Sequence, residues 1–253
     1  MRSLVPADPG GAVDLETAYR YPALQPGAHW LRANMISSVD GAAIDELGGS
    51  RALSGPADRR VLSALRRLAD VIVVGAGTVR ADPGAYRPVR PNPAVRQRRR
   101  ARGQAEVPVI AIVTASLDLD LAGEPFRDGR PLLVTATSAP PERLTGASEV
   151  ADVVIAGAGS RPDPAAMVRE LVGRGLSRIL CEGGPRLLGA ITAAGLLDEL
   201  CLTISPELAG PELRSRILAG ADSGSAARPL RLAHLLEEDG FLFARYTLAT
   251  GTD

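Results

Sequence analysis

Asp-Val-Ile-Val-Val-Gly, residues 70–75, is a short run whose four central side chains are all apolar and β-branched. Such a run is typical of a strand that is buried on both faces of a parallel sheet. Residues 54–69 before it carry apolar side chains at helical spacing, at positions 61, 62, 65 and 68. Ser54 suits an N-cap and Pro56 suits a first helical turn, so a helix is predicted to lead directly into the strand.

The same alternation continues along the chain. Strands are predicted at residues 31–37, 107–114, 131–135, 150–155, 177–182 and 198–205, with further helices at 163–174 and 185–194. The tail, 230–248, predicts an antiparallel hairpin around Asp239-Gly240. This pattern predicts an α/β fold with a central mixed, mostly parallel sheet flanked by helices and a closing C-terminal β-hairpin.

The predicted domain organisation is simple. Residues 1–30 are rich in Pro and Gly and predict an irregular N-terminal arm, followed by a single domain over residues 31–250. Within that domain, residues 86–106 are polar and rich in Arg and Pro, and they predict a loop. The run 96–102 in this loop is expected to be a solvated charge cluster.

The composition excludes several classes of function. The 29 basic residues balance 29 acidic ones, so no global charge attracts the protein to nucleic acid or to an anionic membrane. All basic residues are Arg, which excludes a Schiff-base Lys. Two His and two Cys are too few for a typical zinc site, and Cys181 and Cys201 are expected to be buried in strands. No signal peptide and no run of about 20 apolar residues is found, so a cytoplasmic location is expected.

Glu182-Gly183-Gly184-Pro185 joins a predicted strand to a predicted helix. Glycines there let a phosphate approach backbone N–H groups at a helix N-terminus. A tight turn with a solvated Glu182 is the structural alternative. If the turn binds an anion, Glu182 is expected to face another ligand group, such as an amine or a hydroxyl.

The segment that follows Val74, Gly-Ala-Gly-Thr-Val-Arg-Ala-Asp, does not fit the Rossmann fingerprint, because the sixth position is Arg80 and Pro83 cuts the helix short. It still places Thr78 and Asp82 at a strand end. A dinucleotide could lie across the strand ends from here to Gly184, since ligands collect at that edge of open α/β sheets. Two other features are ambiguous: Asp40-Gly41 is a common turn, and single Arg residues are usually solvated.

Taken in order, these motifs resemble the riboflavin-biosynthesis reductase domain family, over residues 31–248. The resemblance rests on residues 34–41, 50–56, 59–66, 69–83, 182–185 and 197–210. It implies a dihydrofolate-reductase-like fold, a homodimer and NADPH as cofactor. The implied reaction is reduction of the ribosyl group of 5-amino-6-(5-phosphoribosylamino)uracil to a ribityl group, so the implied partner is a phosphorylated pyrimidine and not nucleic acid.

The resemblance also implies roles for individual residues. Positions matching cofactor contacts are Gly75, Thr78, Asp82, Ser116, Gly183 and Gly184. Positions matching substrate contacts are Ser50, Arg66, Arg87 and Glu182. Hydride transfer needs no protein nucleophile, but a proton must reach the opened ribosyl group, and Glu182, Asp40 or water could supply it.

The sequence departs from the family in three places. Ala52 stands where some members carry an aromatic residue beside the nicotinamide. The deaminase motif with Pro-Cys-x-x-Cys is absent, so no deamination is expected. The segment 88–106 has no counterpart in the minimal domain. Dihydrofolate or another imine therefore stays open as the substrate, and a non-catalytic nucleotide- or RNA-binding module using the run 96–102 is the alternative of another class.

Overall fold

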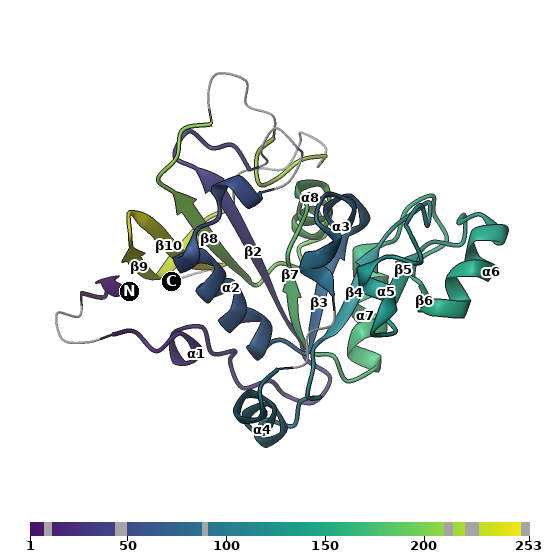
Figure 1. The fold of residues 1–253 in the computed structure, drawn as a ribbon, viewed down its shortest axis with the longest axis horizontal. Helices are drawn as coiled ribbons and strands as arrows, with labels where there is room; N and C mark the ends of the chain where they lie inside the picture. The colour runs from purple at the N-terminus through teal and green to yellow at the C-terminus, as the bar shows by residue number, and fades with distance from the viewer. Residues whose placement is uncertain (8–11, 44–49, 88–90, 210–214, 221–227, 249–253) are drawn as a thin grey trace.

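In a computed structural model, the described residues form a ten-stranded sheet, and helices pack around it (Figure 1). The structure describes residues 1–7, 12–43, 50–87, 91–209, 215–220 and 228–248. The strands lie in the order β1-β9-β10-β8-β2-β7-β3-β4-β5-β6. Their bounds are β1 Arg2–Val5, β2 Trp30–Ser38, β3 Val71–Gly75, β4 Val109–Val113, β5 Leu132–Thr135, β6 Asp152–Ile155, β7 Arg178–Cys181, β8 Glu199–Ser205, β9 Leu230–Glu238 and β10 Phe241–Leu248.

The central strands are parallel and the first edge is antiparallel. From β8 through β2, β7, β3, β4 and β5 to β6, every pair is parallel, whereas β10 pairs antiparallel with both β8 and β9. Parallel strands are buried on both faces, which explains the unbroken apolar run of β3. Their carboxyl ends, including Ser38, Gly75 and Cys181, meet at one edge of the sheet.

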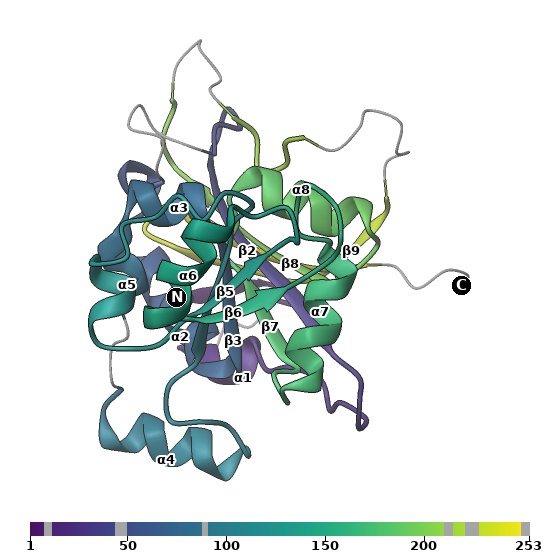
Figure 2. The ribbon, with the colours of Figure 1, turned by 90° about the vertical axis from the view of Figure 1, so that its right-hand side faces the viewer.

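Helices cover both faces of the sheet, as the side view in Figure 2 shows. One apolar core packs under α1 Leu15–Ala18, α2 Pro56–Leu68, α3 Ala76–Ala81, α5 Glu124–Arg127 and α6 Pro141–Val150. The other core lies under α7 Pro164–Gly173 and α8 Pro185–Ala193. The remaining helical elements are α4 Pro93–Ala101 and two short 3-10 turns, η1 Arg51–Leu53 and η2 Pro83–Tyr86.

The predicted fold class is confirmed. Each strand predicted between residues 31 and 205 is present, and the tail forms the hairpin β9–β10. Asp239 and Gly240 have φ values of 53° and 82°, the left-handed values that a tight hairpin turn requires. Cys181 and Cys201 are free and buried in β7 and β8, as expected. No described helix is long and apolar enough to cross a membrane.

The predicted irregular arm over residues 1–30 is wrong in part. Residues 2–5 form the edge strand β1, whose Ser3 is paired with Leu236 of β9. Residues 15–18 form a helical turn capped by Asp14. Tyr19 and Tyr21 after it are buried in the core beneath α2. A four-residue strand shows no clear periodicity, and β1 is ordered by pairing with a segment more than 200 residues away.

The predicted loop at 86–106 is also wrong, because it contains the helix α4. Asn92 caps this helix by accepting from the N–H of Val95 at 3.0 Å, and Pro93 begins its first turn. Arg99 is fully buried, and its Nη1 donates to the carbonyls of Arg67 and Ala69 at 2.8 Å each. A charged side chain therefore faces inward and satisfies the free carbonyls that end α2. Because the buried position carries a charged residue, the apolar periodicity of the sequence does not reveal this helix.

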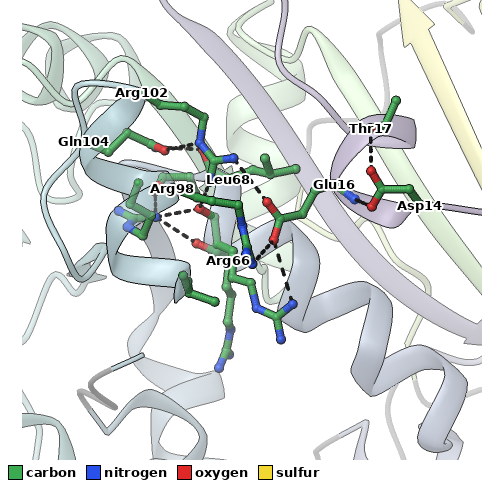
Figure 3. A network of polar contacts seen from close by, with 12 residues as sticks. Asp14, Glu16, Thr17, Arg66, Leu68, Arg98, Arg102 and Gln104 are labelled. Carbon is green, nitrogen blue, oxygen red and sulfur yellow. Dashed lines mark hydrogen bonds and ion pairs between the residues drawn. The ribbon is translucent and has the colours of Figure 1, made fainter. Parts of the chain in front are cut away.

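The other basic side chains of α4 are held by acids. Arg98 and Arg102 donate to the two carboxylate oxygens of Glu16 at 3.1 and 3.2 Å, and Figure 3 shows this contact between α4 and α1. Arg96 and Arg100 pair with Glu106 at 3.2 and 3.3 Å. The run 96–102 therefore joins α1, α2 and α4 through Arg99 and the ion pairs, while Arg98 and Arg100 stay half or more exposed, so the predicted solvated cluster is wrong only in part.

His234 gives the stability of the protein a predictable pH dependence. Its ring is buried against the edge of Tyr19, with ring centres 4.8 Å apart. Burial, helped by the nearby Arg245, lowers the pKa of His234 to about 4 from 6.5. Between these two pKa values the unfolded chain binds a proton that the folded protein excludes. The contribution of neutral His234 to the free energy of unfolding is therefore fully present above pH 6.5 and is lost as the pH falls toward 4.

We expect the melting temperature of the wild type to fall across this pH range, by about 2–4 °C for each kcal/mol lost in a chain of this size. His234→Phe keeps the ring but cannot titrate, so its melting temperature should fall less over the same range. Scanning calorimetry in steps from pH 7 to pH 4 measures both profiles. Parallel profiles for the two proteins would contradict the assignment.

Candidate active site

A cavity of about 460 Å³ opens at the carboxyl edge of the parallel strands. β2 forms one wall, α2 a second, and α3 with the start of α8 the third. The lining residues include Asn34, Met35, Ser50, Ser54, Asp58, Leu62, Arg66, Thr78, Asp82, Tyr86, Glu182 and Gly184. A concave site at this edge is the usual ligand site of an open α/β sheet.

Glu182 and Arg66 form a bidentate ion pair in this cavity. Arg66 donates from Nε and Nη2 to the two carboxylate oxygens of Glu182 at 2.7 and 2.6 Å, and from Nη1 to the carbonyl of Ala85 at 2.9 Å. The side chain of Glu182 is only 5% exposed. Burial disfavours the charged guanidinium, but Glu182 outweighs it and raises the pKa of Arg66. The pair fixes both side chains with planar, two-point geometry.

Tyr86 completes this end of the cavity. Its ring is buried, and the guanidinium of Arg66 lies 5.4 Å from the ring centre. Burial first, and then the nearby carboxylate of Glu182, raise the pKa of the Tyr86 hydroxyl, so it stays protonated and can donate. Arg66 is thereby held between an acid, a carbonyl and an aromatic face.

The glycines of the turn at residues 183–184 form a narrow cradle. The N–H of Gly75 donates to the carbonyl of Gly183 at 2.7 Å, so the ends of β3 and β7 touch through their backbones. Gly183 has φ +80°, and a Cβ on it would lie 3.0 Å from Met35 Sδ. A Cβ on Gly184 would lie 2.9 Å from Thr78 Oγ1. The Gly183–Gly184 peptide is cis.

This cradle fits the phosphate part of a dinucleotide. The N-terminus of α8 begins at Pro185, directly after the cradle, and its free N–H groups favour an anion. Thr78 adds a hydroxyl from α3 that packs directly against Gly184, so a side chain at position 184 would displace it. The residues present therefore fit a phosphate-bearing ligand, which Thr78 and the backbone around Gly184 would contact.

Gly184→Ala tests the cradle. Gly184 has φ −69°, which Ala adopts without strain, so only the added methyl group at 2.9 Å from Thr78 Oγ1 matters. We expect the NADPH that the resemblance implies to bind at least about 10-fold more weakly, a change of about 1.4 kcal/mol, measured by calorimetry. Gly173→Ala in α7 is the control, because a Cβ there meets nothing within 4 Å and should leave the affinity unchanged. An unchanged affinity in Gly184→Ala would remove the cradle from the cofactor site.

The cavity brings together six of the predicted site residues: Ser50, Arg66, Thr78, Asp82, Glu182 and Gly184. Gly75 and Gly183 lie directly behind Gly184 and shape the cradle through their backbones. Glu182, expected to face a ligand amine or hydroxyl, instead uses both oxygens on Arg66.

Besides Gly75 and Gly183, three predicted residues lie outside the cavity lining. Asp40 accepts from the hydroxyl of Ser38 and from the N–H of Ala209, so its carboxylate holds the loop after β2. Its placement gives no support to the predicted acid role. Arg87 points toward α5, 4.0 Å from the carboxylates of Glu124 and Asp128. Ser116 is exposed after β4, and its cofactor contact stays a prediction.

Sequence reasoning missed Asp58, Tyr86 and Asn34. Asp58 stands in the first turn of α2, where an acid usually indicates only a helix start. Tyr86 lies in the stretch that was predicted to be a loop. Asn34 lies within a strand whose other residues are mostly apolar. The presence of a polar residue in a central parallel strand was the one available signal.

Comparisons with known proteins agree with this geometry. The model of the RibD C-terminal domain family matches residues 29–237. The chain belongs to the RibD C-terminal domain family. A relative in Methanothermobacter thermautotrophicus, 2,5-diamino-6-ribosylamino-4(3H)-pyrimidinone 5′-phosphate reductase, is 30% identical over 85% of this chain and 96% of its own length. The relative in Archaeoglobus fulgidus has the same name and is 29% identical over 70% of this chain and 80% of its own length.

Solved structures show the same fold. A pyrimidine reductase-like protein from Corynebacterium diphtheriae superposes with a TM-score of 0.81 at 28% identity, covering 94% of this chain and all of that one. Riboflavin biosynthesis reductase Rib7 of yeast superposes with a TM-score of 0.63 at 16% identity, covering 90% and 93%. The predicted resemblance, its fold and its oxidoreductase class are therefore confirmed for this RibD C-terminal domain.

Proposed function

We propose that this RibD-type domain reduces the ribosyl group of a phosphorylated ribosylaminopyrimidine to a ribityl group, with NADPH as the reductant. The observation that carries the proposal is the single cavity in which the glycine cradle, Thr78 and the Arg66–Glu182 pair meet. The names of the relatives from Methanothermobacter and Archaeoglobus supply the substrate class.

The side chains divide the work by position. Thr78 and the backbone around Gly184 hold the dinucleotide, and Ser50 and Arg66, which line the same cavity, face the substrate. NADPH, when bound, supplies the hydride. Glu182 orients Arg66, and the buried hydroxyl of Tyr86 stays protonated and can donate a hydrogen bond at this end of the site.

The test is loss of NADPH absorbance with the pyrimidine substrate, run beside NADH, dihydrofolate and a reaction without substrate. Turnover of the ribosylaminopyrimidine supports the proposal, and a lower KM for NADPH than for NADH identifies the cofactor. Turnover of dihydrofolate alone would move the activity to the pterin alternative. If NADPH binds in a calorimeter but no compound is turned over, the cofactor assignment is supported and the substrate assignment is rejected.

The RNA-binding alternative has little in the structure to support it. The side chains of Arg96, Arg98, Arg100 and Arg102 pair with Glu16 or Glu106, and Arg99 is buried. A polyanion would have to displace these intramolecular acids. A gel shift that depends on salt and on the run 96–102 would be needed to revive this alternative.

We also propose that the protein is a homodimer. Leu230 and Leu232 on β9 are 39% and 37% exposed, and they are paired with Leu248 and Tyr246 of β10. Neighbouring exposed apolar side chains on a sheet suit a surface that a partner covers. A second copy would cover it and bury more of the hairpin. Sedimentation velocity distinguishes the dimer from a monomer.

A further inference from the structure

The proposed function leaves two substrates that differ in the group on ring carbon 2, which is an amino group in one and a carbonyl oxygen in the other. The relatives named above act on a 2,5-diamino-pyrimidinone, whereas a bifunctional enzyme of Thermotoga maritima is named for reduction of 5-amino-6-(5-phosphoribosylamino)uracil. The 2-amino-4-oxo ring presents two neighbouring donors, N3–H and the 2-amino group. The uracil ring presents N3–H between two carbonyl oxygens. A protein group that reads this edge would decide between them, and the inference below rests on the proposed function.

Asp58 is the group in the cavity that can read such an edge. It lies in the first turn of α2, is 6% exposed, and lines the cavity together with Ser54. Its Oδ2 accepts from Ser54 Oγ at 2.6 Å, and its Oδ1 accepts from Thr203 Oγ at 2.8 Å. The two hydroxyls, from the helix start and from β8, fix the plane of the carboxyl group.

The hydrogen bonds of Asp58 are incomplete for a buried carboxylate. An ionised carboxylate offers about four acceptor sites, and the two hydroxyls use two of them. Within the described part of the chain, no Arg side chain forms an ion pair with it, unlike Glu182. Burial raises the pKa of Asp58 more than the hydroxyls and the neighbouring Arg59 lower it. Two donors from a ligand would stabilise the charged form.

We propose that Asp58 determines the ring specificity of the enzyme, by accepting from N3–H and the 2-amino group of a 2-amino-4-oxopyrimidine. A uracil ring would place its O2 carbonyl against the same carboxylate, so one hydrogen bond is replaced by repulsion between two acceptors. The substrate class is then the 2-amino-pyrimidinone and not its deaminated form.

The cavity-facing stripe of α2 supports this orientation. Asp58, Leu62 and Arg66 all line the cavity at intervals of four residues, one face of a helix. At 1.5 Å of rise per residue, Asp58 and Arg66 are about 12 Å apart along the axis. In this orientation the ring lies at Asp58 and the ribosyl group passes Leu62.

A purely structural role for Asp58 makes a different prediction. An acid in the first helical turn stabilises the helix dipole, and losing it would lower stability without changing substrate preference. The ratio of kcat/KM for the two pyrimidines is unaffected by such a loss. That ratio is therefore the readout.

The experiment measures kcat/KM for 2,5-diamino-6-ribosylamino-4(3H)-pyrimidinone 5′-phosphate and for its uracil counterpart. We expect the wild type to prefer the 2-amino compound by about 100-fold or more, as expected for a site built around a donor that the competitor lacks. In Asp58→Asn the amide offers one acceptor and one donor, so the ratio should fall below 10-fold, mainly through lost activity on the 2-amino compound. Asp163→Asn, at the remote N-cap of α7, should keep the wild-type ratio.

Two results would overturn the proposal: equal kcat/KM for both compounds in the wild type, or a folded Asp58→Asn that keeps the wild-type ratio. The comparison in the wild type needs no variant, so the proposal can be tested even if Asp58→Asn does not fold. If neither compound is reduced, the proposed function has failed. Calorimetric binding of the two compounds to the wild type then tests Asp58 alone, with tighter binding of the 2-amino compound expected and equal binding contradicting it.

Discussion

Glu199→Gln is expected to lower the free energy of unfolding by about 3–5 kcal/mol, because it leaves two guanidinium groups without their acid. Glu199 is fully buried at the start of β8. Its oxygens accept from Nε of Arg32 at 2.6 Å and from Nε of Arg245 at 2.8 Å, and Trp30 Nε1 donates to it at 2.9 Å. Arg32 is itself fully buried, 4.1 Å from the ring centre of Tyr21.

The loss is large because water cannot replace the missing charge. Glutamine keeps the shape of the side chain, so the change isolates the electrostatic contribution. A loss of this size is a considerable share of the usual 5–15 kcal/mol of a globular domain. Urea unfolding followed by circular dichroism measures it. Glu237→Gln is the matched control on β9, since its partner Arg2 is 72% exposed and such pairs contribute about 1 kcal/mol or less. Equal losses in the two variants would contradict the argument.

The same carboxylate adds a pH dependence with a fixed sign. Burial alone would raise the pKa of Glu199, but Arg32 and Arg245 outweigh it and hold the pKa below 4.5. A lowered pKa in the folded state means that this stabilisation is present above pH 4.5 and is lost as the pH falls through the lower folded value. The slope should be absent in Glu199→Gln. The effect of Glu199 begins near pH 4.5, whereas that of His234 begins near pH 6.5.

Arg66→Met is expected to lower kcat/KM by about 100-fold or more, equivalent to about 2.7 kcal/mol of lost transition-state stabilisation. The substitution keeps the apolar stem but leaves Glu182, whose side chain is 5% exposed, without its bidentate partner. The carbonyl of Ala85 also loses its donor, which frees the loop at η2. Arg66→Lys keeps a charge but cannot reach two carboxylate oxygens and a carbonyl in one plane, so an intermediate loss is expected.

The measurement is steady-state kinetics with the ribosylaminopyrimidine, alongside the melting temperature of each variant. Arg60→Met is the control, because Arg60 lies on the same helix, is half exposed and pairs with Glu238 away from the cavity. It should retain wild-type kinetics. If folded Arg66→Met stays within threefold of the wild type, the ion pair is not part of the catalytic site.

Local sequence patterns were sufficient for most of the fold. The β-branched run of β3, the stripe on α2 and the Asp239-Gly240 turn each obey a rule with a short range. The helix α6, Pro141–Val150, was not predicted, because it is only weakly amphipathic and buries just Ala147. The strand β1 and the helix α4 were predicted incorrectly, because distant partners order them.

The candidate site divides in the same way. Glu182 and the glycines at 183–184 could be found because they stand between a strand and a helix, where ligands collect. The partner of Glu182 could not be derived from its neighbours, because Arg66 is 116 residues away. Asp58 was overlooked for the same reason, since Thr203 is 145 residues away and only the packing of α2 on β8 brings them together.

The sequence by itself determined the class of fold, the order of its elements and the edge of the sheet that carries the site, because periodicity, turn chemistry and strand ends depend on neighbouring residues. Tertiary structure alone decided which charges are buried and what each one contacts. In the folded protein Arg99 binds the carbonyls at the end of α2, Glu199 pairs with two guanidinium groups, and Asp58 lines the cavity. The physical reason is that desolvation and hydrogen bonding depend on three-dimensional neighbours, which no local pattern encodes.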